Sequence, residues 1–163
     1  MKFNLLHIIG IAFILSSCDK KELIEKGVIG KFSIIAIVDD STNLLYNLTL
    51  NIVEFNKDGT VLLPGIVSRN NALREDRNIT GKWRLYQKKD VFFIDIISLN
   101  DYFKGTYEVS FDRNKEKEVL QIVLMNEKFI LAGEKLFDHN YNKSFVDDLI
   151  KFTSKSNLPV KVP

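Results

Sequence analysis

The stretch KGTYEVSF, from Lys104 to Phe111, alternates polar and apolar side chains. Successive side chains of an extended chain point to opposite sides, so Tyr107, Val109 and Phe111 share one face of it. This period of two predicts a strand with one buried face and one solvated face. Similar segments fill most of the chain beyond residue 27, which indicates a mainly β domain.

Seven further segments have strand character: residues 31–38, 44–52, 60–67, 79–87, 91–99, 118–125 and 128–137. Segment 44–52 alternates, with Leu44 and Tyr46 on its apolar face. Segment 91–99 is almost continuously apolar, which predicts a strand covered on both faces. Residues 56–59 predict a hairpin turn, because the Asp58-Gly59 pair readily takes positive backbone angles. Pro64 predicts an edge or a bulge in segment 60–67.

The C-terminal segment alone has helical periodicity. Ser144, with Asp147 three residues later, resembles a capping box, in which the two side chains satisfy free amide groups of the first turn. Apolar residues then recur at helical spacing; they are Phe145, Val146, Leu149, Ile150 and Phe152. Since Pro159 limits any continuation, we expect one amphipathic helix packed on the strands.

Eight strands with short connections predict an up-and-down antiparallel barrel or a flattened sandwich, with this helix packed against it. We expect one such domain over residues 27–155, followed by a tail at 156–163. An eight-stranded barrel is wide enough to be filled by side chains or to hold one small ligand. Aromatic residues are the candidates for either role, as a core or as a ligand cavity: Tyr46, Trp83, Phe93, Tyr107, Phe111 and Phe129.

The N-terminus has the order of a bacterial signal peptide: Lys2, an apolar run, and two small serines before Cys18. The run is shorter than the roughly 20 apolar residues that cross a bilayer. Leu15-Ser16-Ser17-Cys18 resembles the lipobox of bacterial lipoproteins, which implies that residues 1–17 are removed and that Cys18 is acylated. Residues 18–26 would form a charged tether. Cys18 is the one cysteine of the chain, so the mature domain would have no disulfide.

Four motifs resemble bacterial lipocalin-like lipoproteins: Gly30-Lys31-Phe32, the hairpin 55–60, Gly81-Lys82-Trp83, and residues 103–107. Lipocalins place a tryptophan where this chain has Phe32. The resemblance implies a lipid-anchored barrel in the cell envelope, facing the periplasm or the exterior, at either the inner or the outer membrane. It further implies a cavity for a small apolar or amphipathic ligand, or a barrel that serves as a scaffold.

The sequence carries no catalytic signature. Beyond the signal peptide the chain has one histidine, His139, and no thiol other than Cys18. The carboxylate pairs Asp39-Asp40 and 147–148 are explained as turn and cap residues. No metal ligand set, phosphate-binding loop or cofactor motif is found. We therefore expect a protein that is not an enzyme.

Charge argues against one class of partner. The 23 Lys and Arg nearly balance the 21 Asp and Glu, and no basic stripe interleaved with aromatics predicts nucleic-acid binding. Two hypotheses remain. One is a ligand-binding lipocalin-like barrel; the other is a structural or protein-interaction module with a filled core, which contacts an envelope protein through the polar loop 68–78 or a sheet face.

Overall fold

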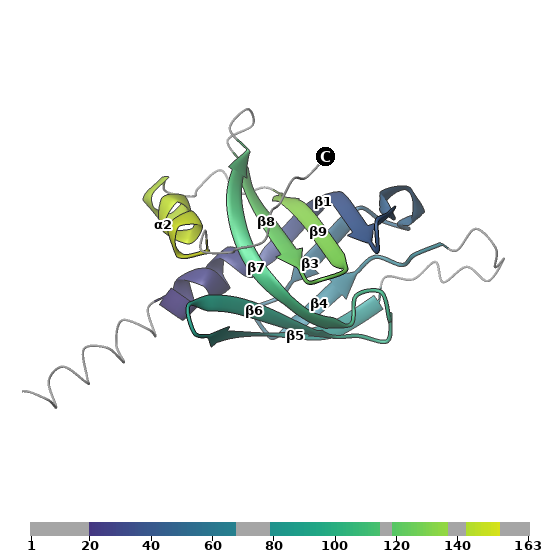
Figure 1. The fold of residues 1–163 in the computed structure, drawn as a ribbon, viewed down its shortest axis with the longest axis horizontal. Helices are drawn as coiled ribbons and strands as arrows, with labels where there is room; N and C mark the ends of the chain where they lie inside the picture. Colours follow the sequence, from purple (N-terminus) through teal and green to yellow (C-terminus); the bar gives the residue numbers. More distant parts are fainter. Residues whose placement is uncertain (1–19, 68–78, 115–118, 137–142, 154–163) are drawn as a thin grey trace, which may run out of the picture.

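The computed structural model describes residues 20–67, 79–114, 119–136 and 143–153, and their strands form one antiparallel sheet in sequence order (Figure 1). The elements are β1 (Gly30–Asp39), β2 (Thr42–Asn43), the 3-10 turn η1 (Leu45–Asn47), β3 (Ile52–Phe55), β4 (Thr60–Leu63), β5 (Ile79–Lys88), β6 (Val91–Ile97), β7 (Gly105–Asn114), β8 (Val119–Met125), β9 (Phe129–Lys135) and α2 (Lys143–Thr153). Residues 20–28 are also helical.

β1 closes the sheet into a barrel. Its first four residues pair with β3, from Gly30 opposite Phe55. On its other edge it pairs with β9, from Phe32 opposite Lys135 to Asp39 opposite Phe129. A register shift between Ile34 and Ala36 interrupts the pairing with β9, as bulges do where a strand bends. Apart from the two-residue β2, eight strands form this ring. The predicted barrel is therefore confirmed, and the flattened sandwich is wrong.

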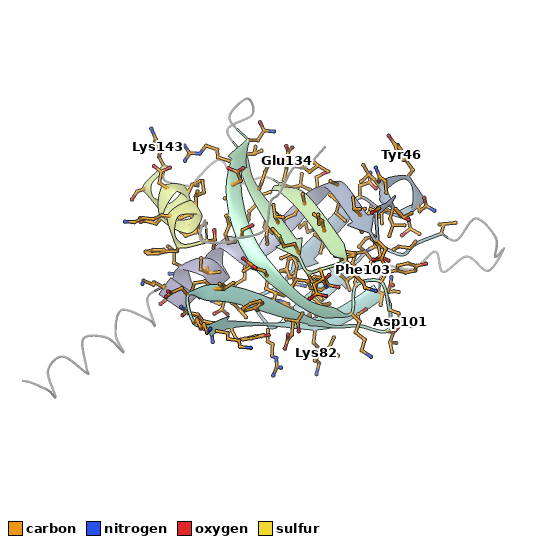
Figure 2. All side chains as sticks on the ribbon, in the orientation of Figure 1. Tyr46, Lys82, Asp101, Phe103, Glu134 and Lys143 are labelled. Carbon is orange, nitrogen blue, oxygen red and sulfur yellow. The ribbon has the colours of Figure 1, made fainter. Side chains whose placement is uncertain are left out.

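The barrel has two different ends. Residues 20–28 and α2 lie at one of them, which we call the helix end (Figure 1). The β1–β2 turn, η1, the β6–β7 loop and the β8–β9 turn gather at the opposite end, which we call the mouth. Figure 2 shows Tyr46 and Asp101 at the mouth and Lys143 on α2 at the helix end.

Aromatic rings pack inside the barrel near both ends. Phe55 makes edge-to-face contacts with Phe32, at 6.3 Å between ring centroids, and with Trp83, at 5.6 Å. The Trp83 indole N–H donates a hydrogen bond of 3.0 Å to the carbonyl of Asn56, in the β3–β4 turn. Trp83 and Phe32 thus belong to one ring cluster although they lie far apart in sequence. A second cluster lies near the mouth and contains Phe103, Tyr107 and Phe129.

The helical residues 20–28 seal the helix end. Ile24 and Val28 have no exposed surface, and a Cβ atom at Gly27 would lie 2.9 Å from side-chain atoms of Leu149 and Phe111. This segment therefore packs on α2 and β7. We expected residues 18–26 to be a charged tether; from residue 20 onward the structure corrects this, because the segment places Ile24 and Val28 one helical turn apart on its buried face.

Lys135 fixes the end of this helical segment. Its side chain is buried, and its ammonium donates to the carbonyls of Gly27, at 3.1 Å, and Ile29, at 2.5 Å. The last carbonyls of a helix have no partner within the helix and carry its negative dipole end. A cation is favourable there. The same ammonium lies 5.2 Å from the centre of the Phe32 ring.

Helix α2 covers a gap in the barrel wall. β7 pairs with β6 only through Gly105–Glu108, so its second half has no β6 neighbour. There the Thr153 hydroxyl accepts a hydrogen bond of 3.1 Å from the amide of Phe111. Val146, Leu149 and Thr153 are buried. The predicted amphipathic helix is confirmed, although it begins at Lys143, one residue before the expected cap.

The predicted strand 44–52 is wrong. Asp40 and Ser41 have positive φ values of 43° and 70°, which reverse the chain after β1. The Asn43 side chain then accepts a hydrogen bond of 2.9 Å from the amide of Leu45, and this contact favours the turn η1 over an extended strand. Only Ile52 of the predicted segment belongs to a strand, β3.

The prediction that segment 91–99 is covered on both faces is also wrong. Buried and partly exposed residues alternate along β6, and the outward Ile97 is 60% exposed. The strand ends there, and Leu99 in the following loop is 93% exposed. A continuous apolar run therefore does not distinguish a doubly covered strand from one whose outer face meets solvent.

The predicted hairpin turn is confirmed. Gly59 has φ +80°, and the Asp58 carboxylate accepts hydrogen bonds from the Thr60 amide and hydroxyl. β4 ends at Leu63, directly before Pro64, as the missing amide hydrogen of proline predicts. Several sequence predictions lie outside the described residues: the signal peptide 1–17, Cys18, the loop 68–78, His139 and the tail 156–163.

Candidate ligand site at the barrel mouth

A hollow of about 360 Å³ lies at the mouth. This volume is within the range of small-molecule sites, and barrel mouths are frequent places for them. The end of β1, the β6–β7 loop, the start of β7 and the β8–β9 turn supply its lining residues: Asp39, Asp101, Tyr102, Lys104, Tyr107, Asn126, Lys128 and Phe129.

Aromatic rings form the floor of this hollow. The rings of Tyr107 and Phe129 lie 5.2 Å apart, and Phe103 meets Phe129 edge to face at 6.0 Å. Tyr107 and Phe129 are 2% and 4% exposed. The floor is thus the mouth-facing part of the core, and only a small part of the Tyr107 and Phe129 rings reaches the hollow.

The Tyr107 hydroxyl has no hydrogen-bond partner within the described part of the chain. Every fully buried side-chain nitrogen or oxygen there does have one. The hydroxyl must therefore retain a small contact with the hollow. A phenol hydroxyl both donates and accepts hydrogen bonds, so this hydroxyl is a group that a ligand in the hollow could satisfy.

Asp39 places a negative charge beside the floor. It pairs with Phe129 across β1 and β9 and is half-buried, and no ion pair or hydrogen bond to its side chain is found among the described residues. Burial, with the charge of Asp39 as a second cause, raises the pKa of Tyr107 to about 12. The phenol is therefore protonated at neutral pH and can donate or accept a hydrogen bond.

Exposed charges of both signs form the rim. The Lys128 ammonium lies 3.7 Å from the Asp40 carboxylate, and both side chains are more than 60% exposed. Asp101 and Lys104 are exposed in or beside the β6–β7 loop. The Asn126 side chain accepts hydrogen bonds from two amides of its own turn. The inner part of the hollow is thus apolar with one carboxylate, whereas the rim is polar and close to neutral.

The six aromatic candidates do not form one group. Tyr107 and Phe129 line the mouth, whereas Trp83 and Phe111 are buried nearer the helix end. The prediction that Phe93 lies in the core or a cavity is wrong. Phe93 faces outward from β6 and stacks on Tyr86, with 5.6 Å between ring centroids, because Phe92 takes the inward position.

The same prediction is wrong for Tyr46, because this residue lies in η1 and not in a strand, and it is 88% exposed. Sequence reasoning missed Asp39 as a site residue and assigned it to a turn alone. Its position at the last residue of a strand, where side chains reach a barrel opening, was the available signal.

A second hollow, of about 220 Å³, lies at the helix end beside Trp83 and is lined also by Lys21, Glu25 and Lys57. No cluster of three or more His, Cys, Asp or Glu side chains suited to a metal ion occurs in the described residues. Within the same residues, no helix has the length and apolar character needed to cross a membrane. No protein-family model, curated protein or solved structure matches the chain.

Proposed function

We propose that this protein is a lipid-anchored, lipocalin-like barrel of the bacterial cell envelope that binds a small amphipathic molecule at its mouth. The observation that carries the proposal is the mouth hollow, with its aromatic floor and polar rim, opposite an end sealed by helices. An apolar floor would bury the hydrophobic part of a ligand, and the rim would leave its polar part in water. The sequence of the first 18 residues supports the anchor.

The anchor depends on the thiol of Cys18. When the full chain is expressed in a bacterium, we expect it to incorporate a labelled fatty acid and to enter the detergent phase on extraction. Cys18→Ser should incorporate none, because the acceptor sulfur is gone. Ser17→Ala is the matched control and should be labelled normally, since small residues suit the cleavage site. Labelling of Cys18→Ser would contradict the anchor.

Binding at the mouth can be measured with the neutral fluorescent probe N-phenyl-1-naphthylamine and the full chain in lipid nanodiscs, after subtraction of empty nanodiscs. We expect saturable binding that Lys104→Trp weakens about fivefold or more, because the indole would fill the hollow. Lys57→Trp, beside the second hollow, is the matched control and should bind like the parent. Equal binding by both variants, or no saturable binding, would contradict a mouth site.

A protein partner is the second candidate. Six large apolar side chains are exposed in the described residues, and all lie in loops or strand ends at the mouth: Tyr46, Leu50, Val67, Ile97, Leu99 and Tyr102. Such a group often marks an interaction surface. A photocrosslinker at Leu99 that captures one envelope protein in intact cells, together with no probe binding, would favour this candidate. Recovery of only free monomer would count against it.

A further inference from the structure

We infer that the mouth site is selective for a small organic cation, whose ammonium group lies between the Asp39 carboxylate and the Tyr107 hydroxyl while its apolar part rests on the aromatic floor. This inference rests on the proposed ligand-binding function and names the ligand class. It follows from three features of the hollow: a carboxylate and a hydroxyl that have no partner among the described residues, and an aromatic lining.

The first feature is the charge of the inner hollow. Asp39 is a half-buried carboxylate with no ion-pair partner among the described residues. The two lysines that line the hollow, Lys104 and Lys128, are exposed on the rim, and Lys128 pairs with Asp40. A partly desolvated anion is costly unless a cation or a donor compensates it. A ligand ammonium would supply both a positive charge and N–H donors, and charge-assisted hydrogen bonds are the stronger kind.

The second feature is the Tyr107 hydroxyl. The residue is 2% exposed, and its oxygen has no partner within the described part of the chain. Asp39 and Tyr107 both line the hollow, so one ligand can reach both groups. A phenol oxygen accepts a hydrogen bond from an ammonium N–H. An anionic ligand head could take the phenol proton as a donor, but it would then face the Asp39 carboxylate.

The third feature is the ring surface. Tyr107 and Phe129 meet at a tilt of 54° on the floor, but they are almost completely buried. The accessible aromatic ring is that of Tyr102, which is 47% exposed on the rim. Aromatic faces attract cations within about 6 Å of the ring centre, by about 0.5–2 kcal/mol. A carboxylate in the same hollow as an accessible aromatic ring is therefore a suitable environment for an amine with an apolar body. Neither the Asp39 carboxylate nor the aromatic lining favours a ligand of the same size that carries a carboxylate or phosphate group.

Three probes that share a phenyl group separate charge from shape: 2-phenylethylamine, 2-phenylethanol and 3-phenylpropionate. With the full chain in nanodiscs at pH 7, calorimetric titration should show the amine binding about tenfold more tightly than the alcohol, as expected for a charge-assisted contact. The carboxylate should bind more weakly than the alcohol. Chemical shifts of Asp39, Tyr107 and Phe129 should change on addition of the amine.

The variants test the two polar groups. Asp39→Asn should weaken amine binding about tenfold and alcohol binding less than twofold, so that the preference for the amine disappears. Tyr107→Phe should weaken amine binding about threefold to tenfold, as for one hydrogen bond. Asp112→Asn removes an exposed negative charge on β7 that does not line the hollow and is the matched control, with less than a twofold effect. A circular dichroism melt of each variant verifies its fold.

The outcomes distinguish the inference from the function beneath it. If alcohol and amine bind equally at the mouth and Asp39→Asn changes neither, cation selectivity is overturned and the mouth site stands. If 3-phenylpropionate binds most tightly, the rim lysines dominate and the inference is wrong. If no probe binds at the mouth, the inference and the proposed function both fail.

Discussion

Phe55→Ala is expected to lower the free energy of unfolding by about 3–5 kcal/mol, the range for removing a large aromatic side chain from a core. Phe55 has no exposed surface and makes edge-to-face contacts with Phe32 and Trp83. Its loss would leave a cavity between two rings that belong to different strands. Urea unfolding followed by Trp83 fluorescence measures the change.

Phe93→Ala is the matched control for Phe55. The two residues are chemically identical, but Phe93 lies on the outer face of β6 and stacks on one partner, Tyr86. We expect a loss of about 1 kcal/mol, the size of an aromatic pair on a partly exposed surface. Equal losses for the two variants would contradict the observed inside and outside faces of the barrel.

Lys135→Met is expected to cost about 2–4 kcal/mol, because the carbonyls of Gly27 and Ile29 would lose a buried charged donor. Methionine keeps much of the apolar part of the lysine side chain, so the loss of stability measures the contribution of the ammonium group. Hydrogen exchange of the amides in residues 24–29 should also accelerate, since the end of this helical segment would be loosened.

Lys31→Met provides the comparison for Lys135. The Lys31 side chain is 54% exposed, and its ammonium lies 3.4 Å from the Glu54 carboxylate. An exposed ion pair contributes about 0–1 kcal/mol, so we expect a change of about 0.5 kcal/mol or less. If the two lysine variants lost the same stability, capping by Lys135 would not be the cause.

Period-two patterns predicted the barrel because each strand buries one face. Tyr107 and Phe111 are inward as expected, and the pattern of Phe129 and Leu131 also places Lys135 inward. That pattern could have revealed the buried lysine. Segment 44–52 has the same alternation as a true strand, yet the turn at Asp40 and Ser41 and the pairing of β1 with β9 leave it no complete place in the ring. Pairing between distant strands overrode local preference there.

The candidate site was less predictable than the fold. Sequence indicated that Tyr107 points inward, but a missing hydrogen-bond partner depends on all the surrounding strands. Asp39 was expected in a turn, which it does flank, and its approach to the floor follows from the register with Phe129. For residues 18–26 the many charges suggested a tether, although the spacing of Ile24 and Val28 already matched a helix face.

The sealed helix end has a consequence for how the barrel stands. If Cys18 carries the lipid, only two residue steps separate it from residue 20, which is helical; two steps reach at most about 7 Å. The linker between the lipid and the barrel would then be very short, and the helix end would lie against the lipid headgroups. The mouth would then point away from the membrane that holds the anchor. Ligands would enter from the aqueous compartment or from a facing surface, and not by lateral diffusion from the anchoring leaflet.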